Sequence, residues 1–176
     1  MPDKPDLIRQ LAELFRTYGY EGASIGIIVD KTGAGRSSLY HFFPGGKADM
    51  ARAVLADIDQ WFEAHIFTPL RHDPPETAIA HMFHAVTRYF HDGQRICLVG
   101  AFALDQTRDQ FAAQVRGYFR DWQAALAQCL ERGGLSPETA QERAIQMLAA
   151  IQGGIVLARA TDDNAAFTAA IAPFTP

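Results

Sequence analysis

The chain has 176 residues, 48% of them hydrophobic and 20% charged, with a formal net charge of −4 at pH 7, and this length allows one core or a small domain beside a larger one. Two cysteines, Cys97 and Cys129, are too few for a disulfide framework or a zinc site, so a reducing compartment is expected. The start MPDKPDLIRQ is unlike a signal peptide and no charge-free apolar stretch reaches the length of a membrane span, which predicts a soluble, cytoplasmic protein.

Apolar residues recur at intervals of three and four along almost the whole chain, which predicts helices. A first helix extends over residues 7–18 and can end at Gly19. A second, short helix begins after Ser24, a good N-cap residue, and ends at Gly33. The third stops at the Pro44-Gly45-Gly46 break.

Further helices are predicted after this region, separated by breaks rich in proline and glycine. Pro69 is expected to end the first of them, and Pro137 suits the first position of a later one. No segment shows the alternating pattern of a strand, so the predicted fold is all-α. The predicted spans are residues 47–68, 79–90, 98–104, 111–132, 136–160 and 164–172.

The segment GRSSLYHFF, residues 35–43, has two contrasting faces when it is drawn as a helix with about 100° between residues. Leu39, Phe42 and Phe43 gather on one side, whereas the other side carries hydrogen-bonding groups and no acid. Two short helices joined by the turn Gly33-Ala34-Gly35 match a helix-turn-helix motif, whose second helix enters the major groove of DNA. Side chains of these types can contact bases or phosphates. The predicted DNA-contacting residues of this helix are Arg36, Ser37, Ser38, Tyr40 and His41.

Two residues at helix starts are predicted to hold DNA phosphates. Lys47 lies unfavourably beside the positive end of a helix dipole, and a bound phosphate would turn this placement into an advantage. Ser24 offers a similar helix start without a charge. The alternatives are that Ser24 is only a cap and that Lys47 is only a solvated lysine.

The charge distribution indicates two parts with different tasks. Residues 1–50 carry six basic and six acidic side chains, whereas residues 51–176 carry ten basic and fourteen acidic ones. The N-terminal part is therefore neutral and the remainder is acidic. A basic N-terminal part would indicate a nucleic-acid partner more strongly.

Residues 14–55 resemble the N-terminal domain of the TetR family of transcriptional repressors. The segments PGGK at 44–47, CLVGAFAL at 97–104 and QGG at 152–154 are also similar to the LmrA/YxaF-like branch of that family. The features that match the family in order and spacing are Phe15, Gly19-Tyr20, Ser24, Ile28, Gly33, Ser38 to Phe43, and Lys47.

This resemblance implies a helix-turn-helix DNA-binding domain of three helices, residues 1–46, and a larger helical domain for ligand binding and dimerisation, residues 47–176. It also implies a dimer that represses a near-palindromic operator until a small molecule binds. The motif departs from the family pattern at Val29, Thr32 and Ala34, and Gly26 and Gly35 loosen its helices. A helical dimer that acts through protein partners instead of DNA is therefore an alternative.

The run AIQMLAAIQGGIVLA, residues 144–158, contains no charge and places apolar residues on every side of a helix. A surface helix would carry one apolar stripe, so this helix needs burial on two sides. The resemblance implies a homodimer interface formed by the helix around 137–160 and the C-terminal helix. A helix buried at the centre of a monomer is the alternative.

Aromatic side chains are dense in the larger domain, and acids accompany two of them on the same helices. Aromatic walls with carboxylates would suit a small hydrophobic or aromatic effector, including a planar cation. Core packing of the rings and exposure of the acids are the alternative interpretations. The predicted ligand-binding residues are Asp57, Trp61, Phe83, Phe90, Phe102, Asp105, Phe119 and Trp122.

His81, His84 and His91 are spaced by three and seven residues and could share a helical face, as metal ligands of a sensor or an enzyme do. No HExxH spacing or nearby carboxylate completes such a set, so structural or surface histidines are the preferred interpretation. A nucleophile elbow and a nucleotide-binding loop are also absent from the sequence. We therefore predict no enzyme activity, no cofactor and no metal, with the histidine metal site as the alternative.

Overall fold

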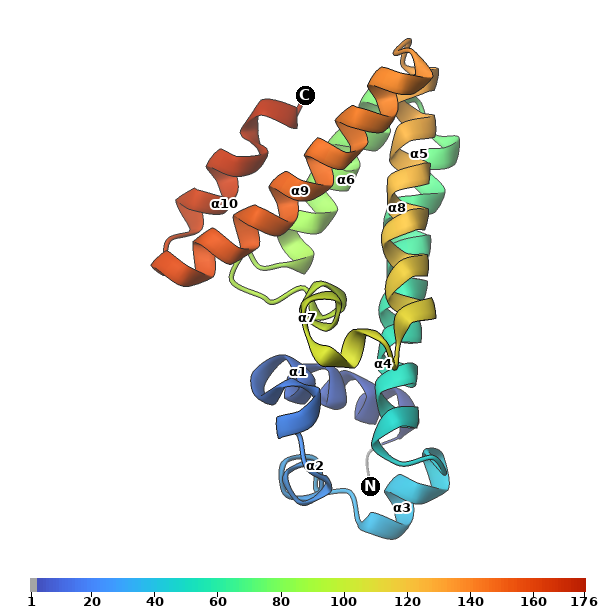
Figure 1. Cartoon of the computed structure of the whole chain (residues 1–176), viewed down its shortest axis with the longest axis vertical. Coiled ribbons are helices and arrows are strands. Elements are labelled where there is room, and N and C mark those ends of the chain that lie inside the picture. Colours follow the sequence, from blue (N-terminus) through green and yellow to red (C-terminus); the bar gives the residue numbers. More distant parts are fainter. Residues whose placement is uncertain (1–2) are drawn as a thin grey trace.

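The computed structural model describes residues 3–176, which form helices joined by turns (Figure 1). No strand forms within this range, which confirms the predicted all-α fold. The first three helices gather at one end of the molecule and are called the head below. They are α1 (Lys4–Gly22), α2 (Ile25–Thr32) and α3 (Arg36–Phe42).

The remaining helices form a larger body above the head (Figure 1). Helix α9 begins after the N-cap Ser136 with a proline at its start, as predicted. The body contains α4 (Lys47–Phe62), the π-helical η1 (Glu63–Phe67), α5 (Thr68–His72), α6 (Pro75–Tyr89), α7 (Leu98–Leu104), the 3-10 turn η2 (Gln106–Arg108), α8 (Ala112–Arg132), α9 (Pro137–Thr161), α10 (Asn164–Ile171) and the 3-10 turn η3 (Ala172–Phe174).

The prediction that Pro69 ends the helix beginning at Lys47 is wrong. The helical path passes from α4 through η1 into α5 and reaches His72. Proline is tolerated at the start of a helix, where its missing N–H would have no intrahelical acceptor, and the wider π-helical turn before it leaves room for the ring.

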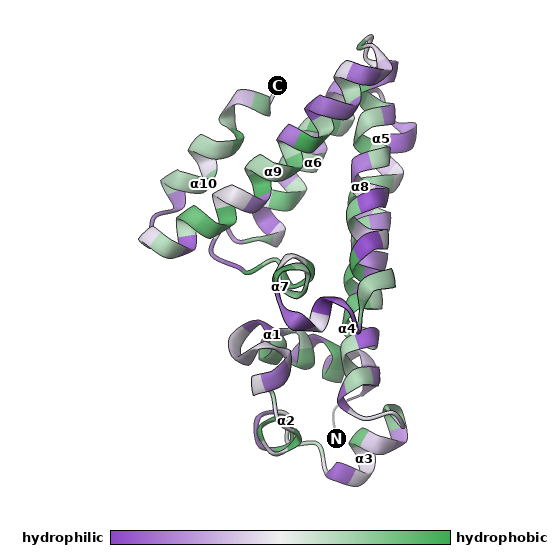
Figure 2. Cartoon of the chain, viewed as in Figure 1, coloured by the Kyte–Doolittle hydropathy of each residue, from purple (hydrophilic) through white to green (hydrophobic). Residues whose placement is uncertain are grey.

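Helix α1 lies between the other head helices and the body, where it packs against α4 and α7 (Figure 1). Helix α4 extends from the head into the body and contacts α8, and α9 packs against both α8 and α10. Figure 2 shows many hydrophilic residues along α8 and a concentration of apolar residues on α7 and α9.

Aromatic rings around Phe62 form the centre of the body. The centroid of the Phe62 ring lies 5.0 Å from that of Tyr89, 4.9 Å from Tyr118 and 5.1 Å from Trp122. The Trp122 indole N–H donates to the sulfur of Met82 at 3.4 Å. Because large rings bury much apolar area, this cluster holds α4, α6 and α8 together.

Helix α9 is the one helix within residues 3–176 that is long and apolar enough to cross a membrane by length and composition alone. Helices packed in the body of a globular protein meet the same criterion. Here α9 packs along α8 and α10, and 39% of its most apolar window is buried.

The turn between α6 and α7 depends on one glycine. His91, Asp92 and Gly93 have positive φ angles of 50°, 53° and 88°. A Cβ at position 93 would lie 2.7 Å from the Phe167 Cβ and 2.9 Å from the Ala158 Cβ. Glycine therefore lets this turn pack directly against α9 and α10.

Replacing Gly93 by alanine should lower the free energy of unfolding by about 2–4 kcal/mol, because backbone strain and overpacking act together. The matched control is Gly117→Ala within α8, where an added Cβ meets no atom within 4 Å. There the same change should raise the free energy of unfolding by about 0.5–1 kcal/mol. Urea titrations followed by circular dichroism measure both; a neutral Gly93→Ala would contradict this description of the turn.

Candidate nucleic-acid interface

Helices α2 and α3 form a tight helix-turn-helix. The Ser24 hydroxyl caps α2 by accepting a hydrogen bond from the Ile27 N–H at 3.3 Å, which confirms the predicted cap. Gly33 ends α2 in the left-handed conformation at φ 67°. Gly35 precedes α3 with extended backbone and, having no side chain, makes no side-chain cap.

Thr32 stabilises the turn from within. Its buried hydroxyl donates to the Ile28 carbonyl at 2.6 Å and accepts from the Ala34 N–H at 3.2 Å. The sequence identifies Thr32 only as a position that departs from the family pattern, and it predicts no role for the hydroxyl. In the structure its hydroxyl satisfies a buried N–H that alanine would leave unpaired.

The outer face of α3 presents a varied set of polar groups. Leu39 and Phe43 are buried, whereas Arg36, Ser37, Tyr40 and His41 are exposed. Ser38 is half-buried at the boundary between the two faces. Helix α3 contains no acid, so nothing on it repels a phosphate or an acceptor group of a base.

Lys47 has partners inside the protein. Its ammonium group donates to the carbonyls of Tyr20 at 2.8 Å and Glu21 at 3.3 Å, and lies 4.5 Å from the centroid of the Tyr20 ring. A cation is favoured at the C-terminal end of a helix, so the ammonium is well placed by α1 although Lys47 begins α4. The side chain is still 21% exposed, and its contact with a phosphate stays a prediction.

Arg16 of α1 joins the head to the body and is 8% exposed. Its guanidinium donates to the Ile96 carbonyl at 3.1 Å and to the Tyr89 hydroxyl at 3.3 Å. The Glu13 carboxylate accepts from Arg16 at 2.8 Å and from Arg95 at 2.6 Å. We call these five residues the junction; every group in it is paired, as a buried arginine requires.

Tyr20 adds aromatic contacts at the same boundary. Its ring centroid lies 6.0 Å from that of Phe102 in α7 and 5.2 Å from that of Phe111 before α8. The side-chain amide of Gln110 donates to the Tyr20 hydroxyl at 3.2 Å. Helix α7 therefore touches α1 directly.

The residues predicted to bind a ligand are scattered. Phe83, Phe90, Phe102 and Trp122 are buried in the core and line none of the main surface pockets of residues 3–176, and Phe119 is half-buried.

The two predicted acids are exposed. Asp105 accepts from the N–H of Gln106, so it caps a turn. Asp57 and Trp61 share a hollow with Arg9, Arg16 and Arg95, whose charges disfavour a cation. Ligand contacts of all eight residues stay predictions.

The histidines do not form a metal site. His81 and His84 lie on the exposed side of α6, and His91 lies in the following turn. The ring nitrogens of His65 and His81 lie within hydrogen-bonding distance of backbone carbonyls, those of Trp61 at 2.8 Å and His65 at 3.0 Å. Among residues 3–176, no group of three His, Cys, Asp or Glu side chains could hold an ion, so the metal alternative has no support.

Comparison with known families agrees with this arrangement. A sequence model described as "Bacterial regulatory proteins, tetR family" matches residues 7–54, which contain the helix-turn-helix. A second one, described as "Transcriptional regulator LmrA/YxaF-like, C-terminal domain", matches residues 75–172. The chain belongs to the TetR family of transcriptional regulators. Both the family and the branch that the sequence resembles are thereby confirmed.

Individual relatives of this TetR-family protein match over most of their length. The "Uncharacterized HTH-type transcriptional regulator YxaF" of Bacillus subtilis is 26% identical over 163 residues, which cover 90% of this chain and 85% of the relative. The "HTH-type transcriptional regulator LmrA" of the same species is 25% identical, with coverages of 86% and 83%. A TetR transcriptional regulator from Legionella pneumophila has the same fold, with a TM-score of 0.85 at 21% identity and coverages of 98% and 95%.

The junction gives the stability of this TetR-family protein a defined pH dependence. Burial alone would raise the pKa of the Glu13 carboxyl, but the hydrogen bond from Arg95 and the charges of both arginines outweigh it and hold the pKa below the ordinary 4.5. Ionised Glu13 therefore adds stability that is fully present above about pH 4.5 and is lost as the pH falls through its folded-state pKa.

We expect Glu13→Gln to be less stable than the wild type at pH 7, and the difference to shrink as the pH falls below about 4.5. Urea unfolding at pH 7 and at several acidic values measures this difference. A stability difference that does not change with pH would show that the Glu13 charge contributes nothing to the junction.

Proposed function

We propose that this chain is a homodimeric repressor that acts in the cytoplasm, binds a near-palindromic operator and releases it when a small molecule binds the body. In this proposal residues 1–46 are the DNA-binding domain and residues 47–176 are the ligand-binding and dimerisation domain. Membership of the TetR family supports it, because regulators of this family bind operator DNA and act as dimers with small-molecule effectors.

The observation that carries the proposal is the outer face of α3. Arg36 and Tyr40 are exposed there, the latter by 46%, beside the exposed Ser37 and His41. A helix of this size fits the major groove, where arginine can read guanine and the hydroxyl groups can contact bases or phosphates. Arg36, Ser37, Ser38, Tyr40 and His41 are the proposed groove contacts.

Ser24 and Lys47 are the proposed phosphate contacts. Ser24 caps the start of α2, where backbone N–H groups and the helix dipole favour an anion. Lys47 is held against the end of α1, which fixes the position of its charge beside the motif. A lysine held in place loses less side-chain freedom when a phosphate binds.

The second side of α9 is the proposed dimer interface, together with α10. One side of α9 is buried, as predicted, while Ile145, Val156 and Leu157 on the other side are 50%, 61% and 53% exposed. Small residues, Ala149 and Gly153, lie between them on the same exposed stripe. Such a surface is unfavourable in water and allows close approach of an identical helix.

In the proposed mechanism, a ligand in the body shifts α4, which begins at Lys47 and connects both parts. The two reading helices must lie about 34–36 Å apart to enter successive major grooves. A small change in this distance therefore lowers operator affinity.

Arg36→Ala and Tyr40→Ala should each weaken binding to the DNA upstream of the protein's own gene by at least about fivefold, which corresponds to about 1 kcal/mol. If Arg36 contacts a phosphate, the slope of log affinity against log salt should also become less steep by about 0.9 for each phosphate that the variant no longer neutralises. Fluorescence anisotropy across a salt series measures both effects.

The matched control is Arg120→Ala, which removes the same charge from the exposed face of α8. Its affinity should equal that of the wild type at moderate salt, because the removed charge is distant from the head. Weakening by Arg120→Ala equal to that by Arg36→Ala would reduce the arginine effect to net charge and contradict the assigned face. Absence of saturable binding would refute the repressor proposal itself.

A further inference from the structure

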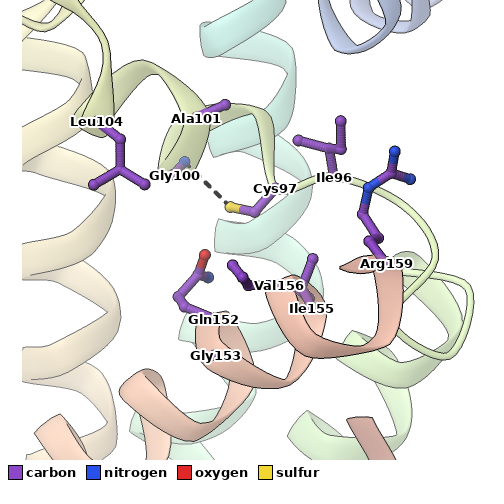
Figure 3. A pocket seen from close by; sticks show the side chains of 10 residues that line it. All are labelled: Ile96, Cys97, Gly100, Ala101, Leu104, Gln152, Gly153, Ile155, Val156 and Arg159. Carbon is purple, nitrogen blue, oxygen red and sulfur yellow. Dashed lines mark hydrogen bonds between the residues drawn. The ribbon is translucent and has the colours of Figure 1, made fainter. Parts of the chain in front are cut away.

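A hollow of about 390 Å³ lies between α6 and the helical path of α4 and η1. This volume is within the range of small-molecule sites. The hollow shares no residue with the pocket of about 430 Å³ between α7 and α9 (Figure 3), whose wall includes Gly153 and Val156 of the surface proposed for a second copy of the chain. None of the residues that line the hollow belongs to α9 or α10, the helices proposed for the dimer interface.

The apolar part of the lining is mainly aromatic. The Trp61 ring stacks on the His65 ring, with centroids 4.5 Å apart and planes at 12°, and its centroid lies 4.4 Å from that of Tyr89. Trp61 and Tyr89 are both half-buried, and Ala85 lies beside them in the lining. Contact between aromatic rings adds to the gain from burying their area, so this surface favours a ligand with a ring. Trp61 is the one residue of the hollow that the sequence predicts as a ligand contact.

The polar part of the lining is basic. It consists of His65, His81, His84 and Arg88, and no acid lines the hollow. A ring nitrogen of His65 and one of His81 already lie against backbone carbonyls. The exposed side chains of His84 and Arg88 form no hydrogen bond or ion pair with residues 3–176. They are four positions apart, so both extend from the same face of α6.

None of the acids around Trp61 on its helical path lines the hollow. Glu63 is paired with Arg71 at 2.6 Å, and Asp59 lies close to an acid of α8. Asp57 lines a separate hollow together with three arginines. Residues 51–176 carry more acidic than basic side chains, so a basic hollow without acids is unusual for this part of the chain. A cleft lined by charges of one sign attracts ligands of the opposite sign.

We propose that this hollow binds a small aromatic carboxylate. The carboxylate accepts hydrogen bonds from the Arg88 guanidinium and the His84 ring, and the aromatic ring of the ligand lies against Trp61 and Tyr89. Arginine matches the geometry of a carboxylate with two parallel hydrogen bonds, which fixes the orientation of the ligand. The charge of this ligand is opposite to that of the planar cation that the sequence allows. That this molecule is the effector rests on the proposed repressor function.

Tyr89 connects the hollow to the junction. Its hydroxyl accepts a hydrogen bond from Arg16 of α1 at 3.3 Å, and the Arg95 guanidinium lies 4.7 Å from the centroid of its ring. A ligand that moves the Tyr89 ring therefore alters a contact that holds α1 against the body. Helix α1 also packs against α2 of the helix-turn-helix, so one helix contacts both the lining of the hollow and the DNA-binding motif.

Three probes separate the two parts of the ligand. They are naphthalene-2-carboxylate, its uncharged carboxamide, and acetate, which has the charge but no ring. In isothermal titration calorimetry the full-length protein should bind naphthalene-2-carboxylate saturably, one molecule per protomer. The carboxamide and acetate should each bind at least about tenfold more weakly, because each lacks one set of contacts. Equal affinity for the carboxylate and either of the other probes, or no saturable binding of the carboxylate, would overturn the proposal.

Arg88→Gln tests the anchor of the carboxylate. It keeps the length of the side chain and removes its charge, so it should weaken naphthalene-2-carboxylate binding at least about fivefold and leave carboxamide binding unchanged. The Tm should not fall, because the Arg88 side chain has no partner in residues 3–176. The matched control, Arg120→Gln on the exposed face of α8, removes the same charge outside the hollow and should leave binding unchanged.

Ala85→Glu tests the location. The new carboxylate lies three positions before Arg88 on the same face of α6, where it pairs with the guanidinium and repels the ligand. Naphthalene-2-carboxylate should then bind at least about tenfold more weakly. Ala124→Glu places the same acid on the exposed side of α8, outside the lining, and should leave binding unchanged. Binding that survives both Arg88→Gln and Ala85→Glu would overturn the proposal.

DNA affinity with and without saturating naphthalene-2-carboxylate tests the role as an effector site. A change in affinity that is absent in Ala85→Glu supports this role, and DNA must then change the affinity for the carboxylate by the same factor. Unchanged DNA affinity would overturn the effector role. A protein that binds the carboxylate as described but no DNA would refute the proposed function while leaving the hollow and its ligand class supported.

Discussion

The burial of Arg16 between the head and the body is the interaction on which the rest of the arrangement depends. An arginine withdrawn from water is tolerated only when its donors are paired, and here the partners are Glu13 on its own helix and Tyr89 and Ile96 in the body. The position of α1 is thereby tied to the segment that leads into α7. Helix α1 also packs against α2, the first helix of the helix-turn-helix, so the same helix contacts both the body and the DNA-binding motif.

The same use of internal pairing explains how the N-terminal part, residues 1–50, can present a surface suited to DNA although it has no net charge. Five of its six acids pair with neighbouring cations, which largely cancels their fields locally, and the sixth, Asp3, caps the start of α1. Arg36 is the one head arginine that forms no ion pair among residues 3–176, and it lies on the acid-free face of α3. The ion pairs of these acids are Asp6 with Arg9, Glu13 with Arg16, Glu21 with Lys47, Asp30 with Lys31, and Asp49 with Arg52.

Helix limits and the outward face of α3 could be predicted because they depend on local signals. Helix α2 begins after the cap Ser24 and ends at Gly33, and α9 begins at Ser136-Pro137. Each of these residues fixes a helix end through contacts with neighbours only a few positions away. Contacts between distant residues could not be predicted in this way: Arg16 and Ile96 are 80 residues apart. Helical periodicity also does not distinguish an aromatic ring in the core from one on a pocket wall, because both positions have the same spacing. The close approach of Gly100 and Gln152 is another long-range contact, which only the packing of α7 on α9 creates.

Hydroxyl-radical footprinting of the full-length protein tests the central claim most directly, on a duplex selected from random DNA for tight binding. The account predicts two protected segments on one side of the duplex, related by two-fold symmetry and about 34–36 Å apart, with both protections abolished in Arg36→Ala. A single protected segment, or protection that Arg36→Ala leaves intact, would contradict it.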